Sequence, residues 1–158
     1  MDHLNRFESR VTFRLLRLEY GVALVVCSAL ALWHISEVRW WPAVVLFVYI
    51  DLIGYIPGAI AFRRSRDGRI SKVYYVLYNT MHSFATHAVV LGVWAAVAGF
   101  EWAFLAVPIH LCGDRALFGN FLKSFRVRFE PVAVPAFVEF ETRVVVQDSA
   151  EHPMPERV

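Results

Sequence analysis

The stretch WPAVVLFVYIDLIGYIPGAIAF, residues 41–62, decides the fold of this chain. It is an almost unbroken apolar run, and about 20 such residues are enough for a helix to cross the hydrocarbon core of a bilayer. Asp51 stands in the middle of the run. An ionisable residue is costly in lipid, so it normally faces the interior of a helix bundle and marks a functional site. The stretch therefore predicts a transmembrane helix that carries one member of a buried polar site.

Three further apolar segments are long enough to span a bilayer. They cover residues 15–35, 73–98 and 101–120. The composition agrees, because 58% of the 158 residues are hydrophobic and only 19% are charged, whereas a typical soluble domain has about 45–50% apolar and about 25% charged residues. We therefore predict an all-α protein, with a four-helix transmembrane bundle over residues 15–123.

The basic residues orient this bundle, because lysine and arginine favour the cytoplasmic side of a membrane. The loop after the second segment is rich in them: Arg63, Arg64, Arg66, Arg69 and Lys72. Other basic residues precede the first segment and follow the fourth, while Arg39 stands alone on the opposite side. Both termini are therefore expected in the cytoplasm. The formal net charge is only +2, and no basic patch interleaved with aromatic residues favours nucleic-acid binding.

The two ends of the chain differ from the bundle. Residues 1–14 form a partly amphipathic arm that suits a helix lying on an anionic membrane surface. Residues 124–158 are expected to form a short cytoplasmic tail. Within it, residues 138–147 mix strand-forming side chains with charge and predict a short strand or hairpin. The polar end of the tail predicts disorder.

Four ionisable residues interrupt the apolar segments: Asp51, His82, His110 and Asp114. At a rise of about 1.5 Å per residue, the first three lie about 14–15 Å from a segment end, close to the middle of a core about 30 Å thick. Asp114 follows His110 by four residues, so both side chains share one helix face. The sequence therefore predicts that these four residues meet.

Other polar side chains share the same helix faces. The residue four positions after Asp51 is a tyrosine, and further polar residues recur at helical spacing around His82. These candidates for a second shell or for substrate binding are Tyr55, Tyr75, Asn79 and Thr86. His87 points away from His82 and is interpreted as a helix-packing or interfacial residue, and Arg115 as a side chain that extends to the interface.

Two imidazoles and two carboxylates at one depth favour a metal site. Neutral imidazole and carboxylate are suitable ligands for Zn, Fe or Mn. A site with three protein ligands keeps a position for water, and the metal lowers the pKa of that water. The residue set Asp51, His82, His110 and Asp114 is therefore predicted to bind one divalent metal or to act directly as catalytic acid and base. Two alternatives are hydrogen-bonded pairs that only lock helices together, and haem b between His82 and His110, which the adjacent carboxylates disfavour.

The motifs also resemble a known family. The runs YIDLIGY (49–55), YNTMH (78–82) and HLCGDRALFGNFLK (110–123) resemble, in order and spacing, a small bacterial integral-membrane family catalogued as domain of unknown function 4260. The resemblance covers residues 15–123. It implies a location in the bacterial inner membrane and a shared polar set at Asp51, Asn79, His82, His110 and Asp114. After residue 123 the chain departs from the family pattern, since RVRFEP supplies no later histidine.

The leading functional hypothesis is a membrane-embedded enzyme that acts on a lipid-like or otherwise apolar small molecule. With a metal, the expected reaction is hydrolysis, and without one it is acid/base isomerisation or cyclisation. A proton or metal-ion transport component is a further alternative, which would require a homo-oligomer, and a structural or assembly subunit is another. The lipid bilayer and an apolar substrate are the expected partners.

Overall fold

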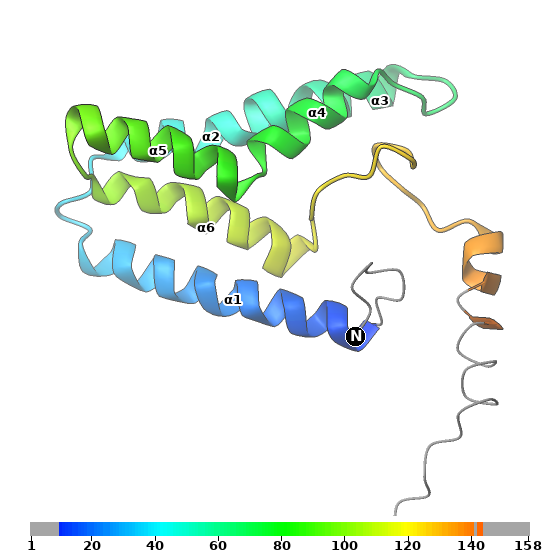
Figure 1. Cartoon of the computed structure of the whole chain (residues 1–158), viewed down its shortest axis with the longest axis horizontal. Coiled ribbons are helices and arrows are strands. Elements are labelled where there is room, and N and C mark those ends of the chain that lie inside the picture. The colour runs from blue at the N-terminus through cyan, green and yellow to red at the C-terminus, as the bar shows by residue number, and fades with distance from the viewer. Residues whose placement is uncertain (1–9, 141, 144–158) are drawn as a thin grey trace, which may run out of the picture.

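A computed structural model describes residues 10–140, 142 and 143, and every regular element in this part of the chain is helical. The elements are α1 (Arg10–Trp33), α2 (Trp40–Gly54), α3 (Ile56–Arg64), α4 (Lys72–Met81), α5 (Phe84–Ala98), the 3₁₀ helix η1 (Trp102–Leu105), α6 (Ala106–Gly113) and the π-helical turn η2 (Asp114–Phe118). They run roughly side by side, with α6 between α1 and α5 in the view of Figure 1, and α6 contacts α1, α2 and α5. The all-α prediction is confirmed.

The predicted strand or hairpin over 138–147 is wrong where the structure describes it, because residues 135–140, 142 and 143 are helical. Residues 144–147, like the polar end of the tail, lie outside the described residues. Of the predicted N-terminal arm, residues 10–14 belong to the first turns of α1, and residues 1–9 also lie outside the description.

Two helical segments are long and apolar enough to cross a membrane: 11–33 within α1, and 40–64, which joins α2 and α3. The pair α4 and α5 would be a third, although it is bent by 56° at a short break. These lengths indicate an integral membrane protein. The segment around α6 is shorter and is built from three kinds of helical turn, so length and composition alone do not establish the predicted fourth span.

The outer faces of the long helices carry apolar side chains with no cover. Val25 and Leu32 on α1 are both 67% exposed, and Val97 on α5 is 84% exposed. Soluble monomers rarely expose contiguous apolar surface on this scale. A hydrocarbon surrounding explains these faces, in agreement with the lengths of the helices.

The core lies where α2, α4 and α6 meet. Leu46 and Ile50 of α2 pack with Met81 of α4 and with Val107 and Leu111 of α6, and all five are buried. A close approach of α2 to α4 is possible because residue 54 is glycine. This close contact fixes the end of α4, where His82 lies.

At one end of the bundle, the α1–α2 connection contacts the α5–η1 connection. Arg39, in the turn before α2, forms an ion pair with Glu101 at 3.1 Å. In the same region Glu37 accepts hydrogen bonds from His34 and from the indole of Trp102, and these bonds lower the pKa of Glu37, the one from His34 most. The contacts join the α1–α2 connection to the α5–η1 connection.

At the other end, residues 119–131 fold back over α3 and α4. Phe129 has no exposed surface and packs with Tyr75 and Tyr78. It lies against Gly58 of α3, where any added Cβ would collide with its ring. Residues 124–131, the first part of the predicted cytoplasmic tail, therefore pack on the folded bundle.

We expect Phe129→Ala to destabilise the protein by about 3–5 kcal/mol, because it removes a fully buried aromatic ring and leaves a cavity. Thermal unfolding of the protein in detergent would measure the loss. Phe140→Ala is the matched control, because Phe140 is 56% exposed and should change stability little. Equal losses in the two variants would contradict the packing role of Phe129.

Candidate metal centre

The structure brings the four predicted ionisable residues together. Asp51 comes from α2, His82 follows the last residue of α4, His110 comes from α6, and Asp114 begins η2. One ligand atom from each residue lies within 4.8 Å of the others. Residues 63 positions apart in sequence thus meet in one cluster, as the common depth along the predicted spans implied.

The distances within the cluster match those around a small metal ion. The Nε2 atom of His82 lies 3.1 Å from Asp114 Oδ2 and 3.4 Å from Asp51 Oδ1. The Nε2 atom of His110 lies 3.7 Å from Asp114 Oδ2 and 3.7 Å from Asp51 Oδ2. Ligand atoms placed tetrahedrally about 2.1 Å from an ion would be about 3.4 Å apart. These four spacings lie on either side of this value, and the ligand atoms of all four residues lie within 4.8 Å of one another, so the four residues could hold a divalent metal.

The ring of His82 is fixed in the orientation that a ligand needs. Its Nδ1 atom lies 3.0 Å from the backbone oxygen of Tyr78. Because a carbonyl only accepts, Nδ1 carries the hydrogen, and in the neutral ring Nε2 then presents its lone pair to the carboxylates. The Tyr78 ring stacks on the imidazole with centroids 3.9 Å apart. A backbone acceptor behind a ligating histidine is the usual means of holding it in place.

His110 has no such partner among the described residues. Its side chain is buried, and neither ring nitrogen makes a hydrogen bond. The ring edge packs on Phe47, with centroids 4.7 Å apart. A buried polar atom without a partner costs roughly 1–3 kcal/mol, and coordination of a metal through Nε2 would remove that cost for one of the two nitrogens.

The cluster is more open on the side of Asp51. The side chain of Asp51 is 41% exposed, against 17% for Asp114 and 4–5% for the two histidines. Asp114 presents a single oxygen to both histidines, whereas Asp51 presents a different oxygen to each. His82, His110 and Asp114 therefore form the enclosed side of the cluster, and Asp51 is the member that an incoming molecule would reach first.

A break between α4 and α5 places His82 at the cluster. Helix breaks leave backbone carbonyls without helical partners, and within a membrane protein these need other donors. His87 supplies one: its Nε2 lies 2.6 Å from Met81 O, while its Nδ1 lies 2.6 Å from the hydroxyl of Tyr49. Both nitrogens of His87 are thus occupied, which confirms its packing role and leaves it no lone pair for a metal.

Arg115 supplies the second donor, and the prediction that it extends to the interface is wrong. Its side chain is buried and donates to His82 O at 3.0 Å and to the hydroxyl of Tyr20 at 2.9 Å. The guanidinium also lies over the rings of Tyr20 and Phe84, at 4.7 and 4.6 Å from their centroids. Arg115 thereby connects α1 to the backbone that carries His82. Its position directly after Asp114 was the available signal for this role.

We expect Arg115→Lys to lower the free energy of unfolding by about 1–3 kcal/mol, since a lysine cannot reach Tyr20 and His82 with a rigid two-pronged fork and leaves a buried carbonyl unpaired. Thermal unfolding in detergent would measure this, with Arg126→Lys as the control because Arg126 is exposed. If both variants melted like the wild type, the bond to His82 O would be energetically unimportant.

Three of the four second-shell candidates, Tyr55, Tyr75 and Asn79, contact residues 119–131. Asn79 donates from Nδ2 to the backbone oxygen of Lys123 at 2.9 Å and accepts from its backbone nitrogen at 2.7 Å. The hydroxyl of Tyr75 donates to Val127 O at 2.9 Å. Tyr55 packs on Tyr78 and Phe129, and the partly buried Thr86 lies beyond the helix break, in the first turn of α5. The contacts of Tyr55, Tyr75 and Asn79 hold the segment in place, and Tyr55 and Tyr75 also pack with Tyr78, whose ring stacks on His82.

No family model, curated protein or solved structure matches this chain. The resemblance to domain of unknown function 4260 therefore stays a prediction, and any assignment of function depends on the geometry of the cluster.

Proposed function

We propose that this protein is a membrane-embedded enzyme that hydrolyses a lipid-like or otherwise apolar substrate. In it, His82, His110 and Asp114 bind one divalent metal, Zn, Fe or Mn, and Asp51 acts beside the metal as acid and base. A bound divalent metal supplies a Lewis acid and lowers the pKa of a coordinated water. The apolar surroundings of the cluster favour a substrate that partitions into the bilayer.

The observation that carries this proposal is the ring of His110. A buried imidazole with no hydrogen-bond partner, 3.7 Å from two carboxylates, is poorly explained as a packing residue. If the four residues served only to join helices, we would expect each nitrogen of His110 to have a partner, as both nitrogens of His87 do. A metal ligand needs one ring nitrogen without a hydrogen-bond partner, here Nε2, whose lone pair is then free for the ion.

The four residues would divide their roles according to burial. His82, His110 and Asp114, on the enclosed side, would hold the ion, and three protein ligands leave a position for water or substrate. Asp51, the most exposed member, would accept a proton from the attacking water and return it to the leaving group. The bond from His82 to the backbone of Tyr78 and the cover of Phe47 over His110 would keep both rings in position.

The same proposal includes four membrane crossings, with α6 and its flanking turns as the fourth. Figure 1 places the start of α1 and the 65–71 loop at one end of the bundle and the α1–α2 and α5–η1 connections at the other. This arrangement supports both termini on the side of the arginine-rich loop. We place that side in the cytoplasm of a bacterial inner membrane.

The experiment is elemental analysis of protein purified in detergent, followed by hydrolysis assays with a series of fatty-acyl esters. We expect close to one Zn, Fe or Mn per chain and ester hydrolysis that stops when a chelator removes the metal and returns when it is restored. A folded protein that neither retains nor takes up these ions would overturn the metal proposal. Metal-dependent ion flux in liposomes without hydrolysis would indicate transport instead.

A further inference from the structure

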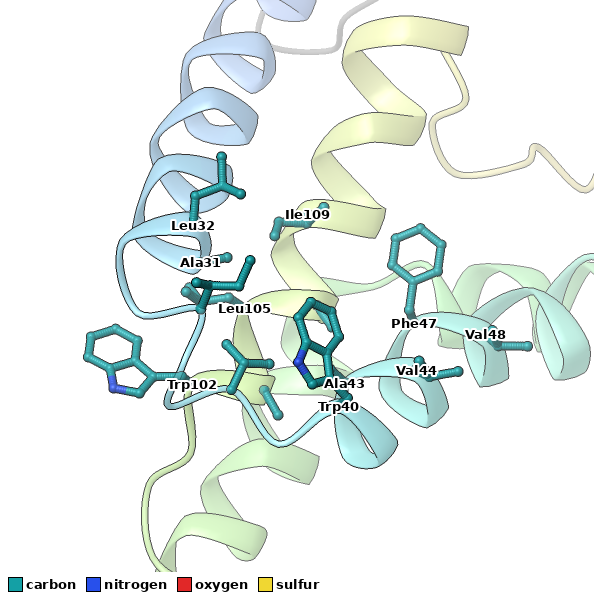
Figure 2. A pocket seen from close by; sticks show the side chains of 14 residues that line it. Ala31, Leu32, Trp40, Ala43, Val44, Phe47, Val48, Trp102, Leu105 and Ile109 are labelled. Carbon is teal, nitrogen blue, oxygen red and sulfur yellow. The ribbon is translucent and has the colours of Figure 1, made fainter.

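The apolar groove between α1, α2 and η1–α6 has a volume of about 400 Å³, within the range of pockets that hold small ligands. Figure 2 shows Leu32 of α1, Val44 and Phe47 of α2, and Ile109 of α6 around this space. None of its lining residues has a charged, hydroxyl or amide side chain. Trp40 and Trp102 also line the groove and are the first residues of α2 and η1, so they precede Asp51 and His110 along the two walls. Such a groove can hold hydrocarbon but offers nothing to a polar headgroup.

The groove leads to the cluster along two helices. On α2 the lining residues Val44, Phe47 and Val48 precede Asp51 by seven, four and three positions. That spacing places all four on one helix face. On α6 the lining residue Ala106 precedes His110 by four positions in the same way. Both walls of the groove therefore continue into ligand residues of the cluster.

Phe47 is the physical link between the two sites. It lines the groove and also packs on the ring of His110. Seven residues of α2, from Val44 to Asp51, correspond to a rise of about 10 Å. A chain extended along this face from the level of Val44, one helical turn beyond Trp40, would bring its last atoms to Asp51, the exposed member of the cluster.

We propose that the groove is the chain-binding subsite of this enzyme: it holds one hydrocarbon chain of the substrate, with the hydrolysable group at Asp51 and the chain end at Trp40 and Trp102. This inference rests on the proposed function and adds the direction in which the substrate lies. It implies that the part of the substrate between the reacting group and the chain end carries no polar group, because no lining residue of the groove has a charged, hydroxyl or amide side chain.

The test uses a medium-chain alkyl hydroxamate, whose head chelates metals, with a photoreactive diazirine at the chain end. After illumination of metal-loaded and metal-free protein in detergent, labelled peptides are identified by mass spectrometry. We expect metal-dependent labelling around Trp40–Val44 and Trp102–Leu105. The lipid-facing surface of α5 around Val93, 60% exposed, should be labelled equally with and without metal, because it contacts the detergent.

Two groove variants and one control variant show whether the label depends on the groove. Val44→Trp fills the groove from a position that is 55% exposed, and we expect at least a ten-fold loss of the metal-dependent label. Val93→Trp places the same ring on a similarly exposed helix position outside the groove and should leave that label unchanged. Ala106→Leu, which narrows the opposite wall, should act like Val44→Trp.

The outcomes separate the two proposals. If the protein binds metal but the metal-dependent label appears on α5 or on residues 119–131, or survives both groove variants, the chain-binding role of the groove is wrong while the metal centre stands. A second outcome is a protein that binds no metal but whose groove is still labelled more strongly than the α5 surface. If Val44→Trp removes that excess labelling, the groove holds a chain and the metal proposal fails. Equal labelling of the groove and of α5 would contradict the chain-binding role of the groove.

Discussion

Replacing His110 with glutamine should abolish stable metal binding. Glutamine keeps most of the side-chain volume but lacks the imidazole nitrogen that faces both carboxylates, with Nε2 3.7 Å from each of Asp51 and Asp114. Loss of outer-shell partners alone typically lowers metal affinity 10–100-fold, so loss of a ligand should lower it by at least about 100-fold. Elemental analysis after dialysis should fall from near one metal per chain to a trace.

The matched control is His34→Gln. His34 is a partly exposed histidine in the α1–α2 connection, where it stacks on Trp102 and contacts Glu37, neither of which belongs to the cluster. This variant should keep the wild-type metal content. The added metal should raise the melting temperature of the wild type and of His34→Gln but not of His110→Gln, because only a ligand that binds the folded state stabilises it. Equal metal content in the wild type and both variants would show that His110 is not a metal ligand.

The cluster itself was predictable from the sequence because transmembrane helices have a fixed rise. Once Asp51, His82 and His110 are counted from the ends of their apolar segments, their depths coincide, and lipid forces such residues inward. Asp114 follows by the spacing of one helical turn. The interruption at Tyr55 was not predicted, because the apolar run over residues 41–62 predicts one continuous helix. Its signal in the sequence is Pro57, which lacks the N–H that α2 would need to continue without a break.

The break after Met81 could not be predicted in this way. Neither proline nor glycine lies between Met81 and Phe84, so the local sequence contains no residue type that predicts a helix break. It is stabilised by side chains distant from it or beyond it in sequence, with His87 bound to Met81 O and Arg115 to His82 O. A helical extrapolation from Tyr75 through Thr86 therefore placed Thr86 beside His82, whereas the break changes the helix direction by 56°.

The contacts of residues 119–131 could not be predicted from the helical spacing of polar and apolar residues either. Asn79 lies on a polar helix face, which predicts proximity to other polar groups but not their identity. Its partner is the backbone of Lys123, and a backbone partner leaves no mark in the sequence. Gly58 carries a clearer signal in hindsight, because a glycine in an apolar helix permits close packing, here of the Phe129 ring.

Replacing Gly54 with alanine should damage both stability and metal binding. A Cβ at this position would lie 2.8 Å from the Cβ of Met81 and 3.2 Å from two ring atoms of His82. Because α2 and α4 must then separate, we expect a destabilisation of about 1–3 kcal/mol, typical of overpacking in a close-packed core. The displaced His82 ring should also weaken metal affinity by about ten-fold or more, since an orienting contact is worth that much.

Gly92→Ala is the control that isolates this effect. Gly92 lies within α5, and a Cβ there would meet nothing within 4 Å, so the same substitution should be neutral or stabilise the helix by up to about 1 kcal/mol. Thermal unfolding and metal titration of the two variants, side by side, make the comparison. A Gly54→Ala variant that binds metal like Gly92→Ala would show that α2 can move away from α4 without moving His82. In that case the position of His82 would depend on the bonds to Tyr78 and Arg115 rather than on helix packing.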